Sequence, residues 1–354
     1  MSCGLKLGEK DLNYRHVMWC SGSVAEGSVG SNGCIKMTLS MSDNGAEIRK
    51  IRVACVIPTT GRSELWSRAL PSVLSQEEPF DEVIVVADAP ASLNPVPGAR
   101  MLHTGGSRGG GAARAQGFAA TQAHWVVFLD DDDEMLPGYC AGLRRRACAL
   151  PETVGLIVPK VHKVWLEGCI PQGCVRPPPK KSKDGLFEIN NSWGVSTFSG
   201  LAVRTERFVG LPLDTDLPAL QDVSLVQGIA ALGYFGVYCE EIRVIFFQYF
   251  STQRVTSDIN ARLKVVEKPE RFGLNLTEQS QQDIILSSIL AHGRKIAWNK
   301  GLITSFKLTA KLLWQYRHRL QAIRHGSKVM LHVAVFMWLA LNRHFALCPK
   351  HMRP

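Results

Sequence analysis

Residues 124–138 have the sequence HWVVFLDDDDEMLPG, in which a short apolar run is followed at once by five acidic residues. The run at 125–129 is rich in Val and Phe, which is typical of a buried strand of a parallel sheet. The four aspartates at 130–133 then crowd like charges at the carboxyl end of that strand, where ligands of open α/β sheets bind. This pattern favours a hard divalent cation, Mg²⁺ or Mn²⁺, that also carries diphosphate oxygens. A solvated acidic turn is the alternative.

Strand and helix patterns alternate on both sides of this stretch. Apolar runs of strand length and apolar residues at helical spacing follow each other through residues 51–150, which predicts an α/β fold with a mostly parallel, doubly wound sheet flanked by helices. The strands that we expect lie at 51–57, 81–88, 99–103, 125–129, 153–165, 195–204 and 234–247. The helices that we expect lie at 62–76, in the alanine-rich part of 105–122, at 136–150 and 220–232, and from 277 onward.

The positive charge of the chain is concentrated at one end. The net charge is +10, from 41 Lys and Arg against 31 Asp and Glu; residues 284–354 hold 12 of the basic residues and none of the acidic ones, which leaves 29 − 31 = −2 for residues 1–283. Because the front of the chain is close to neutral, we expect no nucleic-acid partner. Residues 1–49 are rich in Gly and Ser and lack a period, so we expect a disordered leader there.

Several features predict a cytoplasmic protein. Residues 1–19 hold no apolar core of signal-peptide length, and no run of 18 uncharged apolar residues occurs. The ten cysteines lack C-x-x-C spacing, and we expect even the nearest pair, Cys169 and Cys174, to be free thiols in a reducing compartment.

The glycine-rich segment at 105–117, GGSRGGGAARAQG, leads into a helix. Glycines allow a ligand to approach the backbone closely, and a helix start offers free N–H groups to an anion. The dinucleotide fingerprint G-x-G-x-x-G does not fit, because Arg114 stands where its third glycine is required, and no Gly-Lys pair of a P-loop follows. A dehydrogenase and a P-loop ATPase are therefore disfavoured. The proline-rich basic segment at 167–184 is typical of a functional loop or lid.

Taken in order, these motifs resemble the inverting family 2 glycosyltransferases of the GT-A fold over about 200 residues, 51–250. The resemblance implies a GT-A domain at 50–275 and a basic, amphipathic helical extension at 276–354. It also implies transfer of a sugar from a nucleotide diphosphate sugar, by default a UDP-sugar, to a hydroxyl of a glycan or lipid-linked acceptor. The residues that carry it are Val56, Ile57, Pro58, Thr59, Arg62, Asp88, Gly109, Ala113, Arg114, Gly117, the aspartates 130–133, Gln221 and Asp222.

The resemblance implies a donor site at the strand ends. Pro58, Thr59 and Asp88 match positions that hold the base and the ribose, and we expect Arg62 to join them. Arg114 matches the arginine of the family's loop before the acidic strand. A helix or turn cap is the alternative role for Asp88, and a solvated helix position or a partner of the aspartates is the alternative for Arg114.

The resemblance also implies the metal ligands. The family's D-x-D element maps to Asp130 and Asp132, with Asp132 the nearer ligand of Mg²⁺ or Mn²⁺ and Asp130 facing the ribose or the metal. Asp131 is expected beside the donor as well. Because four aspartates in a row leave the register open, Asp131 and Asp133 are able to exchange roles with the other two.

Inversion requires a general base that takes the proton of the acceptor hydroxyl, and a carboxylate suits this task. Asp222 matches the aspartate of the family's Glu-Asp element, although Gln221 replaces the glutamate. A helix cap is the alternative role for Asp222.

The basic tail supports a second hypothesis. Apolar residues mix with Lys and Arg at 300–328, and the segment 329–341 is strongly apolar. Helices of this kind lie on anionic bilayers, which predicts peripheral contact with the inner face of the cytoplasmic membrane. A helical subdomain packed on the catalytic core, or an oligomer contact, is the alternative.

Three rival functions stay open. A nucleotidyltransferase shares a nucleotide-binding α/β sheet with acidic metal ligands but releases pyrophosphate from a nucleoside triphosphate. A non-enzymatic membrane or polyanion adaptor explains the basic tail but not the aspartates. An inactive transferase is the third, given Gln221.

Overall fold

The structure is a computed structural model of the whole chain, which divides into two compact units, residues 1–51 and 52–354. It describes residues 18–20, 23–29, 35–39, 48, 50–89, 93–106, 108–165, 174–175, 186–187, 197–248, 259–300 and 302–316.

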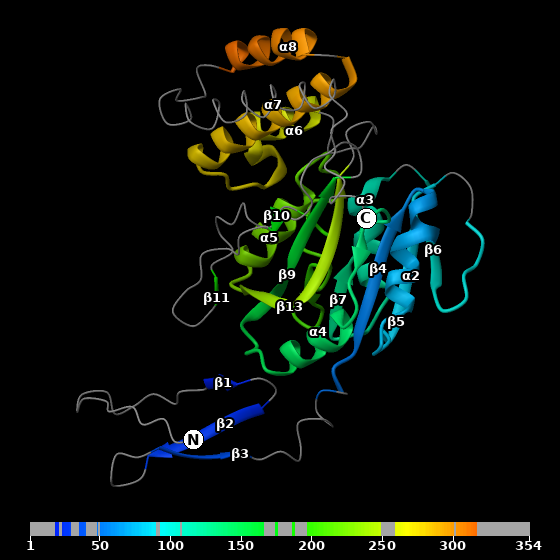
Figure 1. Ribbon diagram of the computed structural model, residues 1–354, viewed down its shortest axis with the longest axis vertical. Helices are drawn as coiled ribbons and strands as arrows, with labels where there is room; N and C mark the ends of the chain where they lie inside the picture. The colour runs from blue at the N-terminus through cyan, green and yellow to red at the C-terminus, as the bar shows by residue number, and fades with distance from the viewer. Residues whose placement is uncertain are drawn as a thin grey trace, which may run out of the picture. The chain divides into compact units, whose positions relative to one another are not determined.

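The first unit holds a small antiparallel sheet in the order β1-β2-β3 (Figure 1). Its strands are β1 (Met18–Cys20), β2 (Ser23–Val29) and β3 (Ile35–Leu39). We expected a disordered leader without regular structure here. Glycine and serine occur in β2, whereas β3 alternates apolar and polar residues in the sequence IKMTL, a short period that the prediction for residues 1–49 did not take into account.

The second unit is built on a ten-stranded sheet that follows the order β11-β13-β9-β12-β7-β4-β5-β6, with β10 paired to β9 and β8 paired to β13. The bounds of its strands are β4 (Val53–Thr59), β5 (Glu82–Ala87), β6 (Arg100–His103), β7 (Trp125–Phe128), β8 (Glu134–Met135), β9 (Val154–Trp165), β10 (Cys174–Val175), β11 (Leu186–Phe187), β12 (Ala202–Arg204) and β13 (Phe235–Gln248).

The predicted α/β class is confirmed, and the sheet is mixed, because it contains antiparallel as well as parallel strand pairs. The strands β7, β4, β5 and β6 pair in parallel, as the alternation of strands and helices requires, and β13 pairs in parallel with β9. The strand β12 differs, because it runs antiparallel to both of its neighbours, β7 and β9. It is also shorter than the strand predicted at 195–204, since Thr197–Leu201 forms a turn that packs against the acidic segment.

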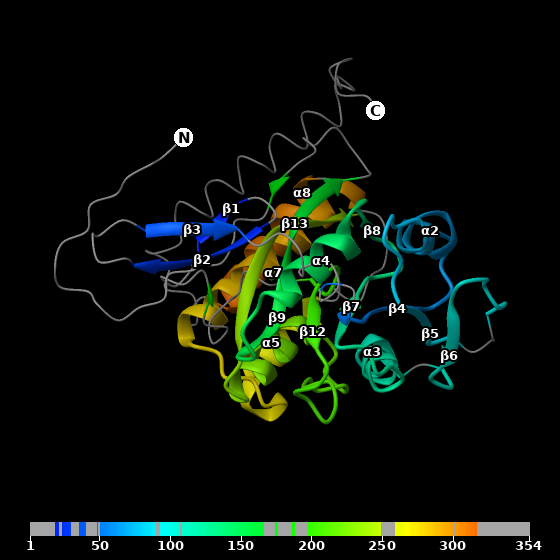
Figure 2. The same ribbon diagram turned by 90° about the horizontal axis from the view of Figure 1, so that it is seen from below.

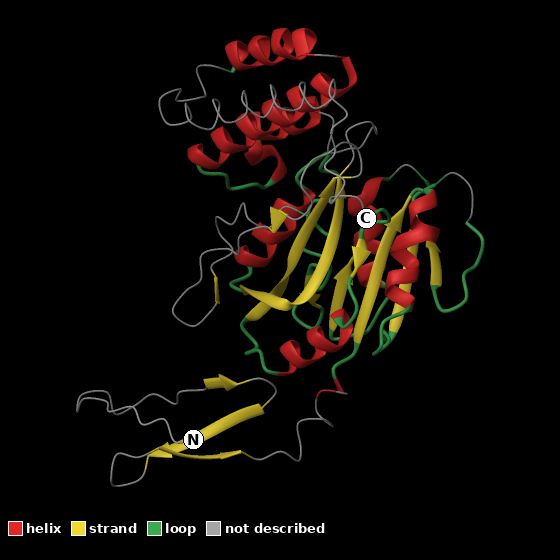
Figure 3. Ribbon diagram, viewed as in Figure 1, coloured by secondary structure: helices red, strands yellow, loops and turns green. Residues whose placement is uncertain are grey.

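Helices cover both faces of the sheet (Figures 2 and 3). On one face lie α3 and α5, and on the other lie the π-helical turn η1 with α2, and α4. Their bounds are η1 (Leu65–Ala69), α2 (Leu70–Leu74), α3 (Gly109–Ala119), α4 (Tyr139–Cys148) and α5 (Gln221–Ala231). A parallel sheet with helices on both faces buries its strands completely, which explains their uninterrupted apolar runs.

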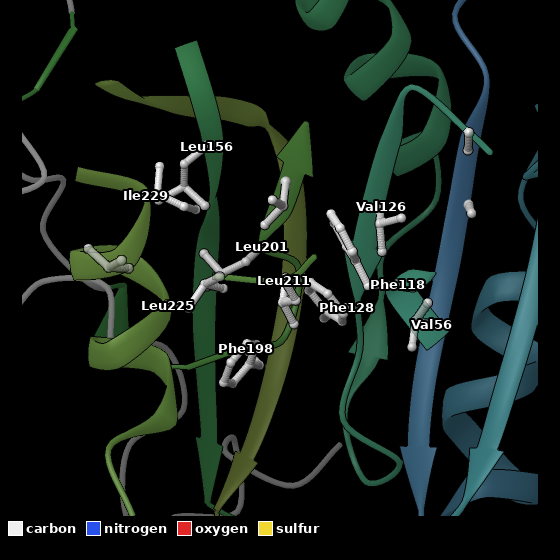
Figure 4. Packing of buried hydrophobic residues seen from close by; sticks show 14 of the residues in the cluster. Val56, Phe118, Val126, Phe128, Leu156, Phe198, Leu201, Leu211, Leu225 and Ile229 are labelled. Carbon is white, nitrogen blue, oxygen red and sulfur yellow. The ribbon is translucent and has the colours of Figure 1, made fainter. Parts of the chain in front are cut away.

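The core beneath α3 and α5 interlocks the two halves of the sheet. Val56, Val126 and Leu156 from three strands meet Phe118 of α3 and Leu225 of α5 in one buried cluster (Figure 4). This packing sets the position of α3 and α5 relative to the strands, and hence of the residues at their N-terminal ends.

The last helices of the described chain are α6 (Ile259–Glu267), the 3-10 turn η4 (Pro269–Phe272), α7 (Glu278–Lys300) and α8 (Leu302–Gln315). They form a second cluster in which Ile284 and Ile285 pack with Leu263 and with Leu217 and Leu220, two residues that precede α5. The C-terminal helices therefore support the N-terminal end of α5. In the described part of the chain, we find no helix of sufficient length and apolarity to span a membrane.

Candidate functional site

Two parallel strands of the sheet, β4 and β5, end at the same level, and their parallel neighbour β7 ends opposite Val56, three residues before the end of β4. Thr59, the last residue of β4, lies opposite Ala87, the last residue of β5, and β7 is the parallel neighbour of β4 on its other side. Asp88 therefore follows β5, and Asp130 follows β7, at one edge of the sheet. The Asp88 backbone N–H donates to the Thr59 carbonyl oxygen at 2.7 Å, so the strand ends form a continuous floor.

Thr59 and Asp131 join the end of β4 to the acidic turn. Thr59 Oγ1 donates to Asp131 Oδ2 at 2.7 Å and accepts from the Gly61 N–H at 2.9 Å. Both side chains are buried, and burial raises the pKa of Asp131 in spite of the opposing effects of Arg62 and Thr59. Pro58, the preceding residue, is buried within β4. Asp131 thus faces the strand end and holds the turn in place.

Arg62 covers the acidic turn from the solvent side. Its Nη1 lies 2.9 Å from Asp132 Oδ2 and 3.4 Å from Asp131 Oδ1. The arginine side chain is 39% exposed, whereas that of Asp132 is 7% exposed. The guanidinium therefore balances the charge of a nearly buried carboxylate while it keeps access to solvent.

Arg114 balances the charge of Asp130 as Arg62 balances that of Asp132. Its Nη2 lies 2.5 Å from Asp130 Oδ1, and its Nη1 donates to Gln221 Oε1 at 3.1 Å. The guanidinium also lies 4.0 Å above the centre of the Phe198 ring. Arg114 therefore connects the acidic turn to the first residue of α5, and it contacts an aspartate as its alternative role predicts.

Asp133 points away from the strand edge and into the core. It is fully buried, and its carboxylate accepts hydrogen bonds from Ser199 Oγ and from the Phe247 N–H, the latter at 2.9 Å. Burial raises the pKa of Asp133, and the charges of Asp132 and Asp130 raise it further. Because both of its oxygens are engaged inside the protein, Asp133 anchors the turn, and the arrangement favours Asp130 and Asp132 as the pair that faces a ligand.

Asp88 organises the glycine loop. Its Oδ1 accepts from Thr104 Oγ1 and from the Arg108 N–H, the latter at 2.9 Å, and its Oδ2 accepts from the Gly109 N–H at 2.7 Å. Burial alone raises the pKa of Asp88, but these hydrogen bonds, with the charge of Arg108, outweigh it and lower the pKa. In this state Asp88 has its alternative role, that of a cap for the start of α3.

Asp222 lies in the first turn of α5, beside the contact between Arg114 and Gln221. Leu220, immediately before the helix, has a φ of 63°, and among the described residues it is the one non-glycine residue with positive φ. Such strain is retained where the surrounding structure fixes it, often at functional sites. Asp222 Oδ1 accepts from the Val223 N–H at 3.0 Å. Asp222 therefore follows directly after Gln221, the residue through which α5 contacts Arg114.

Three residues of the site were not predicted from the sequence. Ser199 anchors Asp133, Phe198 supports Arg114, and Arg262 of α6 lies near enough to Asp222 for their charges to interact. Burial lowers the pKa of Arg262, against the effect of Asp222, and its Nε has no hydrogen-bond partner in the structure. Ser199 and Arg262 carry no local motif, because they reach the site through tertiary packing. The sequence offered one local signal for Phe198 and Ser199, namely that they directly precede a glycine in the run FSG at 198–200.

The carboxylates fit a divalent cation only in part. Asp130 and Asp132 supply hard oxygen donors, but the described residues include no group of three or more His, Cys, Asp or Glu side chains arranged to hold a metal. Mg²⁺ in proteins is often held by one or two carboxylates with substrate phosphates as the remaining ligands. The site fits a cation of that kind, one that arrives with a diphosphate.

A known protein family matches the part of the chain that contains these strand ends. Residues 54–192 match the family model described as Glycosyl transferase family 2. The match covers this segment, which is less than half of the chain. The matched segment contains β4, β5 and β7 together with the glycine loop and the acidic turn, so every strand end that forms the floor of the site lies within the matched residues.

The individual proteins that this chain resembles are distant from it in sequence. The chain is 32% identical over 104 residues to the succinoglycan biosynthesis protein ExoO of Rhizobium meliloti (strain 1021), which covers 27% of this chain and 30% of ExoO. It therefore spans about a third of that relative's length. Among solved structures it is similar to S. aureus TarS 1-349, with 14% identity, a TM-score of 0.45, and coverage of 78% of this chain and 92% of TarS 1-349. It is also similar to GalNAc-T7 with UDP, GalNAc and Mn²⁺, with 14% identity, a TM-score of 0.43, and coverage of 64% and 52%.

Proposed function

We propose that this protein is an inverting glycosyltransferase that moves a sugar from a nucleotide diphosphate sugar, a UDP-sugar, to a hydroxyl of a glycan or lipid-linked acceptor. The observation that carries the proposal is the contact of Arg114 with both Asp130 and Gln221. Through this contact, a single side chain, Arg114, connects the aspartates that follow β7 to α5, the helix that bears Asp222. The family match of residues 54–192 supports the reaction class, and the name of the relative ExoO supports a role in surface polysaccharide synthesis.

In the proposed reaction, the Asp222 carboxylate accepts the proton of the acceptor hydroxyl. The acceptor oxygen forms a bond to the anomeric carbon on the face opposite the leaving group, and the bond from that carbon to the diphosphate oxygen breaks. The nucleoside diphosphate leaves with the electron pair of that bond. Asp222 then releases its proton to solvent.

Asp130 and Asp132 are the residues that would hold Mg²⁺ or Mn²⁺ with the donor. When bound, the cation neutralises the charge of the departing diphosphate. Arg62 and Arg114 each contact one of these carboxylates, so their charges balance the acidic turn in the free protein. Pro58, Thr59, Asp88 and the loop that Asp88 organises are proposed to contact the nucleoside.

Thermal unfolding with nucleotides tests the donor site, because a bound ligand raises the unfolding midpoint. We expect UDP with Mn²⁺ to raise the midpoint of the full-length protein, and Mn²⁺ alone to raise it far less, since the protein supplies only two carboxylates. A screen of UDP, GDP and CMP sugars identifies the nucleotide. A failure of every nucleotide to shift the midpoint, with or without metal, would refute the donor site.

Asp222→Asn tests the proposed base. Removal of a general base lowers turnover by roughly 10²–10⁴-fold, whereas UDP with Mn²⁺ should stabilise the variant as it does the wild type. Asp216→Asn is the matched control, because Asp216 is exposed in the loop before the same helix and its loss should leave transfer unchanged. Wild-type turnover in the Asp222 variant would disprove the assignment.

Product analysis separates the rival functions. A glycosyltransferase releases a nucleoside diphosphate and forms a glycosidic bond, whereas a nucleotidyltransferase consumes a nucleoside triphosphate and releases pyrophosphate. A polyanion adaptor would bind heparin or nucleic acid in a salt-sensitive manner, and this binding would survive Asp132→Asn. An inactive transferase would bind the donor without releasing a nucleoside diphosphate.

We also propose that the C-terminal extension, 276–354, contacts an anionic membrane surface at the inner face of the cytoplasmic membrane. In α8, Ile303 and Trp314 are 75% and 69% exposed, and the exposed Lys307 and Lys311 lie between them at helical spacing. Each basic residue near anionic headgroups contributes roughly 1 kcal/mol. The part of the proposal that concerns 317–354 lies outside the described residues.

Flotation with liposomes tests the membrane contact. Vesicles that contain phosphatidylglycerol should carry the protein upward, and vesicles of phosphatidylcholine alone should not. Replacing Trp314 and Lys311 by serine should lower the floated fraction, while the control Lys264→Ser, at an exposed position of α6, should not. Equal flotation of both variants and the wild type would remove α8 from the contact.

A further inference from the structure

Arg114 has two partners that differ in charge. One is the Asp130 carboxylate, at 2.5 Å, and the other is the neutral Gln221 amide oxygen, at 3.1 Å. The arginine side chain is only 10% exposed, and the Phe198 ring lies beneath its guanidinium at 4.0 Å. Because burial and stacking fix the guanidinium, the two partners are held in a defined relative position.

Two glycines of α3 make room for this contact. A Cβ on Gly110 would lie 2.9 Å from Arg114 Nη1, and a Cβ on Gly111 would lie 3.0 Å from Gln221 Nε2 and 3.1 Å from the Thr215 carbonyl oxygen. Neither glycine has a positive φ, so space, and not backbone conformation, requires them. The glycine-rich helix start is therefore shaped to fit the side chains of Arg114 and Gln221.

The amide of Gln221 uses both of its ends. While Oε1 accepts from Arg114, Nε2 donates to the Leu217 carbonyl oxygen at 2.9 Å. A glutamate at this position, which the family resemblance leads one to expect, has no N–H to donate to that carbonyl. Its negative charge would instead make a second ion pair with Arg114. Glutamine is thus the residue type that hydrogen-bonds both to Arg114 and to the Leu217 carbonyl oxygen without forming an ion pair with the arginine.

We propose that Gln221 is a positioning residue that links Asp130, through Arg114, to the helix that carries Asp222. Because the Gln221 amide is neutral, the positive charge of Arg114 stays available to Asp130 and to the bound donor. The inference rests on the proposed function, since it assigns a role within the same site. It accounts for the replacement of the family's glutamate as an adaptation of this site, and it predicts that charge and position are separable by mutation.

Two variants separate these contributions. Gln221→Glu keeps the shape but adds a charge, so Arg114 is shared between two carboxylates, and we expect the donor KM to rise by about tenfold. Gln221→Met stays neutral but loses both hydrogen bonds, so we expect kcat to fall by about tenfold while the donor KM changes by less than about twofold. The thermal shift caused by UDP with Mn²⁺ should decrease for the Glu variant only.

Gln227→Glu is the matched control. Gln227 lies on the same helix, but its amide exchanges hydrogen bonds with the backbone of Asn275, both at 2.9 Å, and not with Arg114. The same charge added there should leave the donor KM and the nucleotide thermal shift at wild-type values. A purely structural role of Gln221 would lower the unfolding midpoint without this division between KM and kcat.

The outcomes are distinguishable from those of the proposed function. If the wild-type protein binds UDP and transfers sugar, but Gln221→Glu equals Gln227→Glu in donor KM and Gln221→Met keeps wild-type kcat, the inference about Gln221 is wrong and the function stands. If the wild-type protein neither binds a nucleotide nor transfers a sugar, the proposed function is wrong, and the role of Gln221 falls with it.

Discussion

Replacing Gly117 by alanine should force α3 away from β4. A Cβ on Gly117 would lie 2.4 Å from Val56 Cγ1, and 3.1 Å from Val56 Cγ2 and Val86 Cγ2. The closest distance is about 1 Å shorter than an ordinary carbon contact. Val56 and Val86 are fully buried in the sheet, so they have no free space to turn into. Overpacking of this kind costs about 1–3 kcal/mol.

A second substitution tests whether this contact is the cause. Val56→Ala removes two of the three methyl groups that the new Cβ would meet, including the nearest one, at a cost of about 2 kcal/mol for the lost burial and the cavity. In the double variant, the alanine at 117 fills part of that cavity. We therefore expect the double variant to be more stable than the sum of the single effects predicts, by at least about 1 kcal/mol.

Thermal unfolding of the full-length protein, followed by circular dichroism, measures these effects. A change of about 1 kcal/mol moves the midpoint by roughly 2–4 °C in domains of 150–250 residues, so Gly117→Ala should lower it by several degrees. Gly210→Ala is the control, because no atom lies within 4 Å of a Cβ there. Equal midpoints for the two alanine variants, or additive effects in the double variant, would refute the close approach of α3 to β4.

Three further predictions follow from single contacts. Asp88→Asn should destabilise the protein by about 1 kcal/mol at most near neutral pH, because the Asp88 side chain is partly exposed. The pKa of Asp88 is lowered, so the stability that its carboxylate contributes is present above the ordinary pKa of 3.8 and is lost as the pH falls below that value. The unfolding midpoints of variant and wild type should therefore converge in acid. Tyr139→Phe removes the 2.5 Å hydrogen bond to the buried Gly200 carbonyl oxygen and should cost about 1–3 kcal/mol in urea unfolding; an unchanged midpoint would argue against that bond. Arg62→Ala removes the cation that competes at Asp132, so calorimetric titration with Mn²⁺ alone should show binding about fivefold tighter, and weaker binding would contradict the role of Arg62 as a counter-charge.

The central parallel strands β4, β5 and β7 were predictable because their residues are buried, whereas the edge strand β6 is only partly buried and has a weaker pattern. The run predicted at 81–88 is β5, Glu82–Ala87, and the weak one at 99–103 is β6, Arg100–His103. Helix ends were less predictable. The helix expected from 136 begins as α4 at Tyr139, after Gly138 with a φ of 77°, because the preceding residues pair as β8 with β13. That pairing joins segments over a hundred residues apart, which no local pattern reports.

Local pattern also failed to show the direction of β12. Its three residues, Ala202–Arg204, are apolar or buried and suit either direction. Its antiparallel orientation depends on a tertiary contact of the turn that precedes it. In that turn the Gly200 N–H donates to the carbonyl oxygen of Phe128, the last residue of β7, at 2.7 Å. Cys174 is the first residue of β10, but Cys169 and most of the loop at 167–184 lie outside the described residues, as do the apolar segment at 329–341 and the end of the chain.

The sequence by itself determined the chemistry that is present and its order along the chain. Buried apolar runs followed by carboxylates, a glycine-rich helix start and an aspartate in a later helix were sufficient to predict the α/β sheet and the residues gathered at its edge. Only the tertiary structure decided which aspartate faces which neighbour. In the turn after β7, successive side chains point in different directions: Asp130 toward Arg114, Asp131 toward Thr59, Asp132 toward Arg62 and Asp133 toward Ser199. Four identical residues in a row carry no information about those directions, because the partners that distinguish them come from other strands and helices, brought to the site by packing.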